Sequence, residues 1–204
     1  MPNVDKPDGY RPVKYLNGSP WNGAVSRYVV PAANTTAIFI GDIVELDGQV
    51  GTDRGKEFRG ILTLTQTNNG TPAGVVVGFE EDPLNLNITG LFRSTGAKST
   101  DRIAYVVDDP NVLFEVQVSD TGLPAAAVGL NTGPIITAGS TTTGRSAFEL
   151  SSTEVTTAAI MFKLVEFIQR EDNLITDVAS TGARWLVKFN AFHQYLTTTG
   201  STGV

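Results

Sequence analysis

Short apolar runs, many of them alternating with polar residues, recur along the chain from about residue 27 onward. In Ile61–Thr65 the alternation has a period of two, as in a half-buried strand. Residues 73–80 form a strongly apolar segment that ends in Glu80, which is typical of a buried strand. Clusters of Gly, Pro, Asn and Asp separate the runs and indicate turns. We therefore expect strands over residues 27–31, 37–46, 61–65, 73–80, 87–92, 102–107, 112–118, 145–150, 158–169 and 184–195.

Some of these segments carry a further expectation. The turn Asp108–Asn111 predicts that 102–107 and 112–118 form an antiparallel hairpin, and Asp47-Gly48 predicts another turn. Residues 49–59 are polar and indicate a loop or a ragged hairpin.

Two segments are ambiguous in type. Residues 125–130 suit either a short buried strand or a single turn. Residues 158–169 could form an amphipathic helix, but a strand is favoured because their polar residues do not share one face. In total, about eight to eleven short strands with little helix predict an all-β fold, either a small β-barrel or a β-sandwich.

Residues 1–24 differ from the rest of the chain. Four prolines fix the backbone and remove hydrogen-bond donors, so neither a helix nor an uninterrupted strand is expected. The aromatic residues Tyr10, Tyr15 and Trp21 make the segment too apolar for a solvated tail. It is therefore expected to be an extended arm on another surface, with residues 25–196 as the β body and 197–204 as a flexible tail. Folding of the segment back onto its own core is the alternative.

These aromatic residues are the candidate partner-binding anchors, since tyrosine and tryptophan are enriched among residues that dominate interface energies. Arg11 and Lys14 are the candidate charge partners, because they make the segment locally basic in an acidic protein.

Composition and charge exclude several classes of protein. The formal net charge of −6 argues against binding to nucleic acid or to an acidic membrane surface. The chain has no cysteine, so disulfides and thiolate metal sites are excluded. It contains no apolar stretch of about 18 residues, and its N-terminus does not resemble a secretory signal. A soluble protein made in a cytoplasm is expected.

Candidate chemistry is sparse. The single histidine, His193, has no recognisable nucleophile motif with it, and a structural role is favoured. Asp101, Asp108, Asp109 and Glu115 gather near one predicted hairpin, where carboxylates could hold Ca²⁺ or hydrolyse a glycoside. An ordinary turn is the favoured interpretation, because Asp and Asn cap their own backbone. We expect no catalytic residue, no metal and no cofactor.

Several segments together resemble head structural proteins of tailed bacteriophages. They are PDGYRPVKYLNGSPWNG (7–23), RYVVP (27–31), IFIGDIV (38–44), GVVVGFE (74–80), YVVDDPNVLFEVQ (105–117), VGLN (128–131) and TTTGRSAFEL (141–150). The resemblance implies a capsid decoration, or cement, protein: a jelly-roll-like or β-tulip-like barrel or sandwich with an extended arm. It also implies the major capsid protein as partner, self-association as a homodimer or homotrimer, and a place on the capsid exterior after assembly in the host cytoplasm.

Two other functions stay open. One is a virion-surface module of a tail or head fibre that binds a receptor or a glycan through exposed aromatic, Asp and Asn side chains. The other is a glycosidase that uses Asp101, Asp108 or Glu115, although an enzyme is not the expected class.

Overall fold

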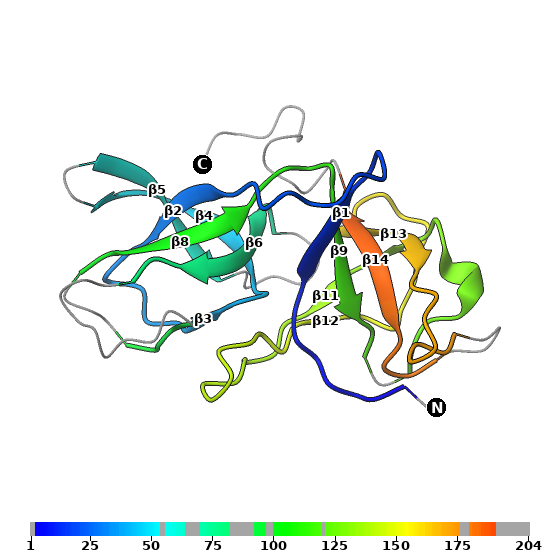
Figure 1. Cartoon of the computed structure of the whole chain (residues 1–204). Coiled ribbons are helices and arrows are strands. Elements are labelled where there is room, and N and C mark those ends of the chain that lie inside the picture. Colours follow the sequence, from blue (N-terminus) through cyan, green and yellow to red (C-terminus); the bar gives the residue numbers. More distant parts are fainter. Residues whose placement is uncertain are drawn as a thin grey trace.

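The computed structural model describes residues 3–53, 56–63, 70–81, 92–96, 100–119, 121–175 and 180–190, and it confirms an all-β fold (Figure 1). Within these ranges the one helical turn is the 3₁₀ turn η1 (Ala125–Ala127). The strands are β1 (Arg11–Tyr15), β2 (Ser26–Val30), β3 (Ile38–Phe39), β4 (Ile43–Asp53), β5 (Lys56–Thr63), β6 (Pro72–Phe79), β7 (Phe92–Arg93), β8 (Arg102–Val107), β9 (Val112–Gln117), β10 (Asn131–Thr132), β11 (Pro134–Ile135), β12 (Glu149–Leu150), β13 (Phe162–Phe167) and β14 (Arg184–Phe189).

The first half of the chain forms a closed barrel of five strands in the order β2-β5-β4-β6-β8. Most neighbours are antiparallel, and the barrel closes between β8 and β2, where Tyr28 lies opposite Ala104. The short pair β2–β5 is parallel and has Val29 opposite Gly60. Because the sheet closes on itself, the barrel leaves few strand edges open to other chains.

A five-stranded antiparallel sheet in the order β1-β9-β14-β13-β10 lies beside the barrel (Figure 1). Its central strands come from the second half of the chain, but its edge strand β1 comes from the N-terminus. The small sheets β11–β12 and β3–β7 complete the fold.

Three barrel strands contribute to two hydrophobic cores at once. Val44 and Val76 point into the barrel, whereas the preceding residues Ile43 and Val75 pack into the core under the five-stranded sheet. Since successive side chains of a strand point to opposite faces, a strand buried on both faces must be apolar at every position. This explains why residues 73–79 carry no polar side chain, and the shared packing joins barrel and sheet into one unit.

The predicted hairpin between 102–107 and 112–118 is wrong in its pairing, although both strands exist. β8 pairs with β2 and β6 in the barrel, whereas β9 pairs with β1 and β14 in the sheet. The turn Asp108–Asn111 therefore carries the chain from one sheet to the other. A turn motif fixes a change of direction, but it does not fix the strand against which the next segment packs.

Other local predictions have mixed outcomes. Asp47-Gly48 does not end a strand, because β4 continues through an irregularity between Leu46 and Val50 into a long hairpin with β5. The segment 125–130 forms a single 3₁₀ turn, and 158–169 contains strand β13, as favoured. Within 145–150 only the last two residues, β12, are strand. The predicted strand at 87–92 lies outside the described residues except for Phe92, and the predicted tail 197–204 lies wholly outside them.

Candidate partner-binding site

The N-terminal segment does not form a separate extended arm. Residues 11–15 form β1, the edge strand of the five-stranded sheet, with Arg11 opposite Glu115 and Tyr15 opposite Val112. The alternative, folding back onto the chain's own core, is the observed arrangement. The physical reason is that the backbone of residues 11–15 pairs with β9, and the ring of Tyr10 before it is buried against Phe162.

Tyr10 is not an exposed anchor, and this candidate is corrected. Its side chain is 1% exposed, and its ring stacks on Phe162 with centroids 4.7 Å apart. The hydroxyl donates a hydrogen bond to the Glu149 carbonyl oxygen at 3.2 Å. Burial raises the pKa of the Tyr10 hydroxyl well above its ordinary value, with a further contribution from the charge of Glu149. Tyr10 therefore anchors the segment to its own chain.

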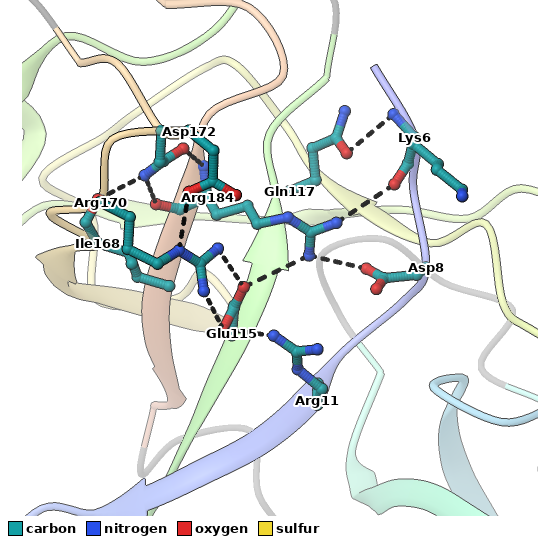
Figure 2. A network of polar contacts seen from close by, with 10 residues as sticks. Lys6, Asp8, Arg11, Glu115, Gln117, Ile168, Arg170, Asp172 and Arg184 are labelled. Atoms are coloured by element: carbon teal, nitrogen blue, oxygen red, sulfur yellow. Dashed lines mark hydrogen bonds and ion pairs between the residues drawn. The ribbon is translucent and has the colours of Figure 1, made fainter. Parts of the chain in front are cut away.

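Arg11 belongs to an ion-pair cluster centred on Glu115 (Figure 2). Only 4% of the Glu115 side chain is exposed, and its carboxylate lies 2.7 Å from Arg11 Nη2 and 3.0 Å from Arg170 Nη2. Arg184 Nη1 lies 3.6 Å from the same carboxylate and 2.9 Å from Asp8 Oδ1. Burial tends to raise the pKa of Glu115, but hydrogen bonds and charge from Arg11 and Arg170 outweigh it and lower that pKa.

The cluster extends to the first described residues of the chain. Gln117 donates to Asp5 Oδ1 at 2.8 Å and accepts from the Lys6 backbone N–H at 3.1 Å. The side-chain amide of Asn3 donates to the Leu174 carbonyl and accepts from the Leu174 N–H. Ion pairs and hydrogen bonds thus hold residues 3–11 against β9 and β14, and most of the local positive charge noted in the sequence is compensated within the chain.

Lys14 is compensated in the same way, because its Nζ lies 2.9 Å from Glu166 Oε2 on β13. An exposed pair of this kind contributes little stability. It still leaves Lys14 less available as a charge partner for another molecule.

The segment after β1 folds back along its outer edge as a hairpin, residues 13–25, which we name the β1 hairpin. Tyr15 N–H donates to the Ser19 carbonyl at 2.8 Å, and Trp21 N–H donates to the Val13 carbonyl at 3.0 Å. These bonds, together with a bulge at Val13, occupy the edge of β1. Covering an edge in this way prevents pairing with strands of other chains.

The β1 hairpin nevertheless gathers exposed apolar side chains. Val13, Leu16 and Val25 are 37%, 50% and 40% exposed. The two remaining aromatic candidates, Tyr15 and Trp21, are half-buried and pack against the core with part of each ring facing solvent. The structure therefore keeps Tyr15 and Trp21 near a surface and removes Tyr10 from it.

A shallow hollow of about 530 Å³ lies between the turn of the hairpin and the turn after β8. Its lining combines an aromatic ring with amide and carboxylate groups: Tyr15, Leu16, Asn17, Asp109 and Asn111. The polar groups are engaged within the chain, since Asp109 Oδ1 accepts from both nitrogens of Asn111 and Tyr15 donates its hydroxyl to Asn22.

The candidate catalytic carboxylates have structural partners. Asp101 accepts hydrogen bonds from the backbone N–H groups of Ala32 and Thr52, and Asp108 accepts from the hydroxyls of Ser26 and Tyr28. Among the residues that the structure describes, no group of three or more His, Cys, Asp or Glu side chains could hold a metal ion. His193 lies outside the described residues.

Sequence reasoning missed two sites. One is the ion-pair cluster around Glu115. Its arginine partners Arg11, Arg170 and Arg184 are each more than 50 residues away from Glu115 in the sequence. The other is Asp42, a buried carboxylate in the turn before β4. The polar Gly41-Asp42 pair inside an apolar run was its only signal, and such a pair more often marks a turn.

Searches for similarity add no identification. The chain matches no known protein family, and no curated protein matches it. Across the described ranges, no helix is both long and apolar enough to cross a membrane. What is established is the class: an all-β protein in which a closed barrel, with a core of its own, packs against an antiparallel sheet through a second, shared core.

Proposed function

We propose that this protein is a capsid decoration, or cement, protein of a tailed bacteriophage. It binds the outer surface of the major capsid lattice and stabilises the head by bridging neighbouring capsomers. The observation that carries the proposal is the β1 hairpin, where the exposed side chains of Val13, Leu16 and Val25 gather with the half-buried rings of Tyr15 and Trp21 on an acidic molecule. The resemblance to phage head proteins gives the class of partner.

Binding through side chains of a folded hairpin replaces binding through a free arm. The backbone edge of β1 is already occupied, so a capsid protein cannot add a strand there. Burying a fully exposed leucine contributes about 1.5–3 kcal/mol. Leu16 is already half-buried, so it contributes less, and one hairpin gives modest affinity. In a homodimer or homotrimer, several hairpins bind the capsid at once, and the resulting avidity needs no new contacts.

A second candidate is a virion-surface module that binds a receptor or a glycan. The hollow beside the hairpin favours it, because an aromatic ring flanked by carboxylate and amide groups suits a sugar. Tyr15, Asp109 and Asn111 already bond within the chain, however, so a sugar would have to compete with those bonds. The decoration role therefore ranks first, and neither role involves catalysis.

The test uses heads assembled from the major capsid protein of the same virus without this protein. The double variant Leu16→Asp/Val25→Asp places charges on the hairpin, and Val128→Asp is the matched control on η1's C-terminal side, where Val128 is 44% exposed. We expect each copy of the double variant to bind heads at least about tenfold more weakly than the wild type. This corresponds to a loss of about 1.4 kcal/mol in binding free energy. The control should co-sediment like the wild type.

All three proteins should unfold at the same temperature, because the substituted side chains are at the surface. Undiminished co-sedimentation of the double variant would contradict the role of the hairpin. Failure of the wild type to bind heads, together with binding to a glycan array that Tyr15→Ala abolishes, would favour the second candidate.

A further inference from the structure

Two Asn-Gly pairs lie in the β1 hairpin, Asn17-Gly18 and Asn22-Gly23, and all four residues are exposed. The backbone nitrogen of the residue after an asparagine can attack its side chain, and glycine hinders this attack least because it has no β-carbon. Both glycines have positive φ angles, of 88° and 84°, and nothing lies within 4 Å of a β-carbon built on either. Each pair therefore has open space for the succinimide ring that the attack forms.

The two asparagines are alike in how the attacked carbonyl group is held. Asn17 Oδ1 accepts hydrogen bonds from the Ser19 backbone N–H at 3.0 Å and from the Ser19 hydroxyl at 2.6 Å. Asn22 Oδ1 accepts from the Tyr15 hydroxyl at 2.8 Å and from the Ala24 N–H at 3.1 Å. Attack on Cγ moves negative charge onto this oxygen, and two donors stabilise that charge in each case. The carbonyl groups therefore do not distinguish the two pairs.

The two pairs differ in the attacking nitrogen. Gly18 N–H donates a hydrogen bond to the Tyr15 carbonyl oxygen at 2.9 Å. Gly23 N–H has no hydrogen-bond partner within the described part of the chain. The nitrogen attacks after it has lost its proton to hydroxide, and a hydrogen-bonded amide loses that proton only when the bond opens. Gly23 is therefore the more available nucleophile.

We propose that Asn22 is a site of spontaneous covalent modification, deamidation through a succinimide, and that the Gly18–Tyr15 hydrogen bond protects Asn17 from the same reaction. Hydroxide removes the amide proton of Gly23, and the nitrogen forms a bond to Asn22 Cγ. The bond between Cγ and Nδ2 breaks, and Nδ2 takes a proton from water and leaves as ammonia. Water then opens the ring at one of its two carbonyl groups. The product is aspartate or isoaspartate, in which the backbone runs through the side chain.

The modification changes the charge of the β1 hairpin. Either product adds a carboxylate between Trp21 and Val25, and isoaspartate also lengthens the backbone by a methylene group. The hairpin therefore gains a negative charge with age, on the segment that carries the exposed side chains of Val13, Leu16 and Val25. The modification itself does not rest on the proposed function.

Incubation of the folded protein in mildly alkaline buffer, followed by mass spectrometry of its peptides, tests the proposal. Trypsin releases residues 15–27 as one peptide, in which fragment ions separate Asn17 from Asn22. Asn22 should convert at least about fivefold faster than Asn17, the factor that corresponds to the net contribution of one hydrogen bond, about 1 kcal/mol. The third Asn-Gly pair, Asn69-Gly70, lies in another peptide, and Asn69 is outside the described residues.

Two controls separate the fold from the local sequence. In urea that unfolds the chain, Asn17 and Asn22 should convert at nearly equal rates, because glycine follows both. Asn22→Gln should leave only the slower conversion of Asn17 in this peptide. Amide hydrogen exchange of the native protein, followed by NMR, measures the nucleophiles directly. Gly23 should exchange as an unprotected amide, whereas Gly18 should be protected at least about fivefold.

Three outcomes would overturn the proposal. One is conversion of Asn17 in the folded protein as fast as that of Asn22. Another is a preference for Asn22 that persists unchanged in urea, because neighbouring side chains rather than the fold would then select the site. The last is a Gly23 amide that is protected from exchange as strongly as that of Gly18.

Discussion

The ring of Tyr10 stacks on that of Phe162, with 15° between the ring planes, and so joins the N-terminal segment to strand β13. We expect Tyr10→Ala to lower the free energy of unfolding by about 3–5 kcal/mol, because it removes a fully buried aromatic ring. Tyr10→Phe should cost only about 1 kcal/mol, since it loses a single hydrogen bond at 3.2 Å. Urea denaturation of both variants measures the difference. Equal stability of the two would contradict the packing role of the ring.

Deletion of residues 1–24 should prevent cooperative folding of the remaining chain. The deletion removes strand β1, uncovers Phe162 and leaves Glu115 without Arg11. Circular dichroism and thermal unfolding of the truncated protein check this. A truncated protein that unfolds at the wild-type temperature would show that the N-terminal segment is dispensable for the fold.

Gly9 and Gly18 offer a matched pair of substitutions. Both have positive φ angles, of 75° and 88°, which cost an alanine about 1–2 kcal/mol. A β-carbon at Gly9 would also lie 2.7 Å from the Gly41 carbonyl oxygen, whereas nothing lies within 4 Å of one at Gly18. Gly9→Ala should therefore destabilise the protein by clearly more than Gly18→Ala, as measured by thermal unfolding. Similar losses of stability for the two variants would mean that the contact of Gly9 with Gly41 can adjust to a side chain.

The buried carboxylate of Glu115 should make a pH-dependent contribution to stability. At pH 7, Glu115→Gln should cost about 2–3 kcal/mol, less than a fully buried pair would, because Arg11 and Arg170 reach solvent. The matched variant Glu166→Gln breaks an exposed pair and should cost under about 1 kcal/mol.

The pKa of Glu115 is lowered in the folded state from its ordinary value of 4.5. Its stabilising contribution is therefore complete above that pH and is lost as the pH falls through the lower folded-state pKa. Chemical denaturation of wild type and Glu115→Gln at pH 7 and in acid measures this, and a difference that stayed constant into acid would contradict the ion-pair account.

Arg93 should be sensitive even to replacement by lysine. The residue is 2% exposed, and its guanidinium donates to the carbonyls of Ser94 at 2.8 Å and of Gly96, Pro31 and Ala32, each at 3.2 Å. An ammonium group has three donors on one atom and cannot span these four acceptors. Arg93→Lys should lower the free energy of unfolding by about 2–3 kcal/mol, whereas Arg145→Lys on the surface should change it little. Unfolding in urea compares the two variants, and an equally small effect of both would contradict the bridging role.

The strands were largely predictable from the sequence because alternation and β-branched residues act locally. Strands β8, β9, β13 and β14 fall within segments expected from the sequence pattern, and β6 begins one residue before its expected segment. Of β5, only residues 61–63 lie in an expected strand. The pairing of those strands was not predictable in the same way. Val107 and Val112 are separated by an ordinary turn, yet they enter different sheets. The choice depends on which apolar faces meet in three dimensions.

The candidate site shows the same division. The sequence alone identified residues 1–24 as unusual and identified its aromatic residues as anchors, since proline content and ring size are local properties. Tertiary structure decided what they anchor. Tyr10 is buried in the chain's own core, while Tyr15 and Trp21 remain near the surface beside Leu16.

The charges of the N-terminal segment also could not be interpreted from the sequence alone. The charged residues of the sequence indicated a basic N-terminal segment. In the folded chain, however, Arg11 pairs with Glu115 and Lys14 pairs with Glu166, each more than 100 residues away. The sequence by itself determined an all-β protein with short strands and a distinctive N-terminus. Only the tertiary structure decided that this N-terminus completes a sheet, because an edge strand gains its stability from distant partners that no local pattern encodes.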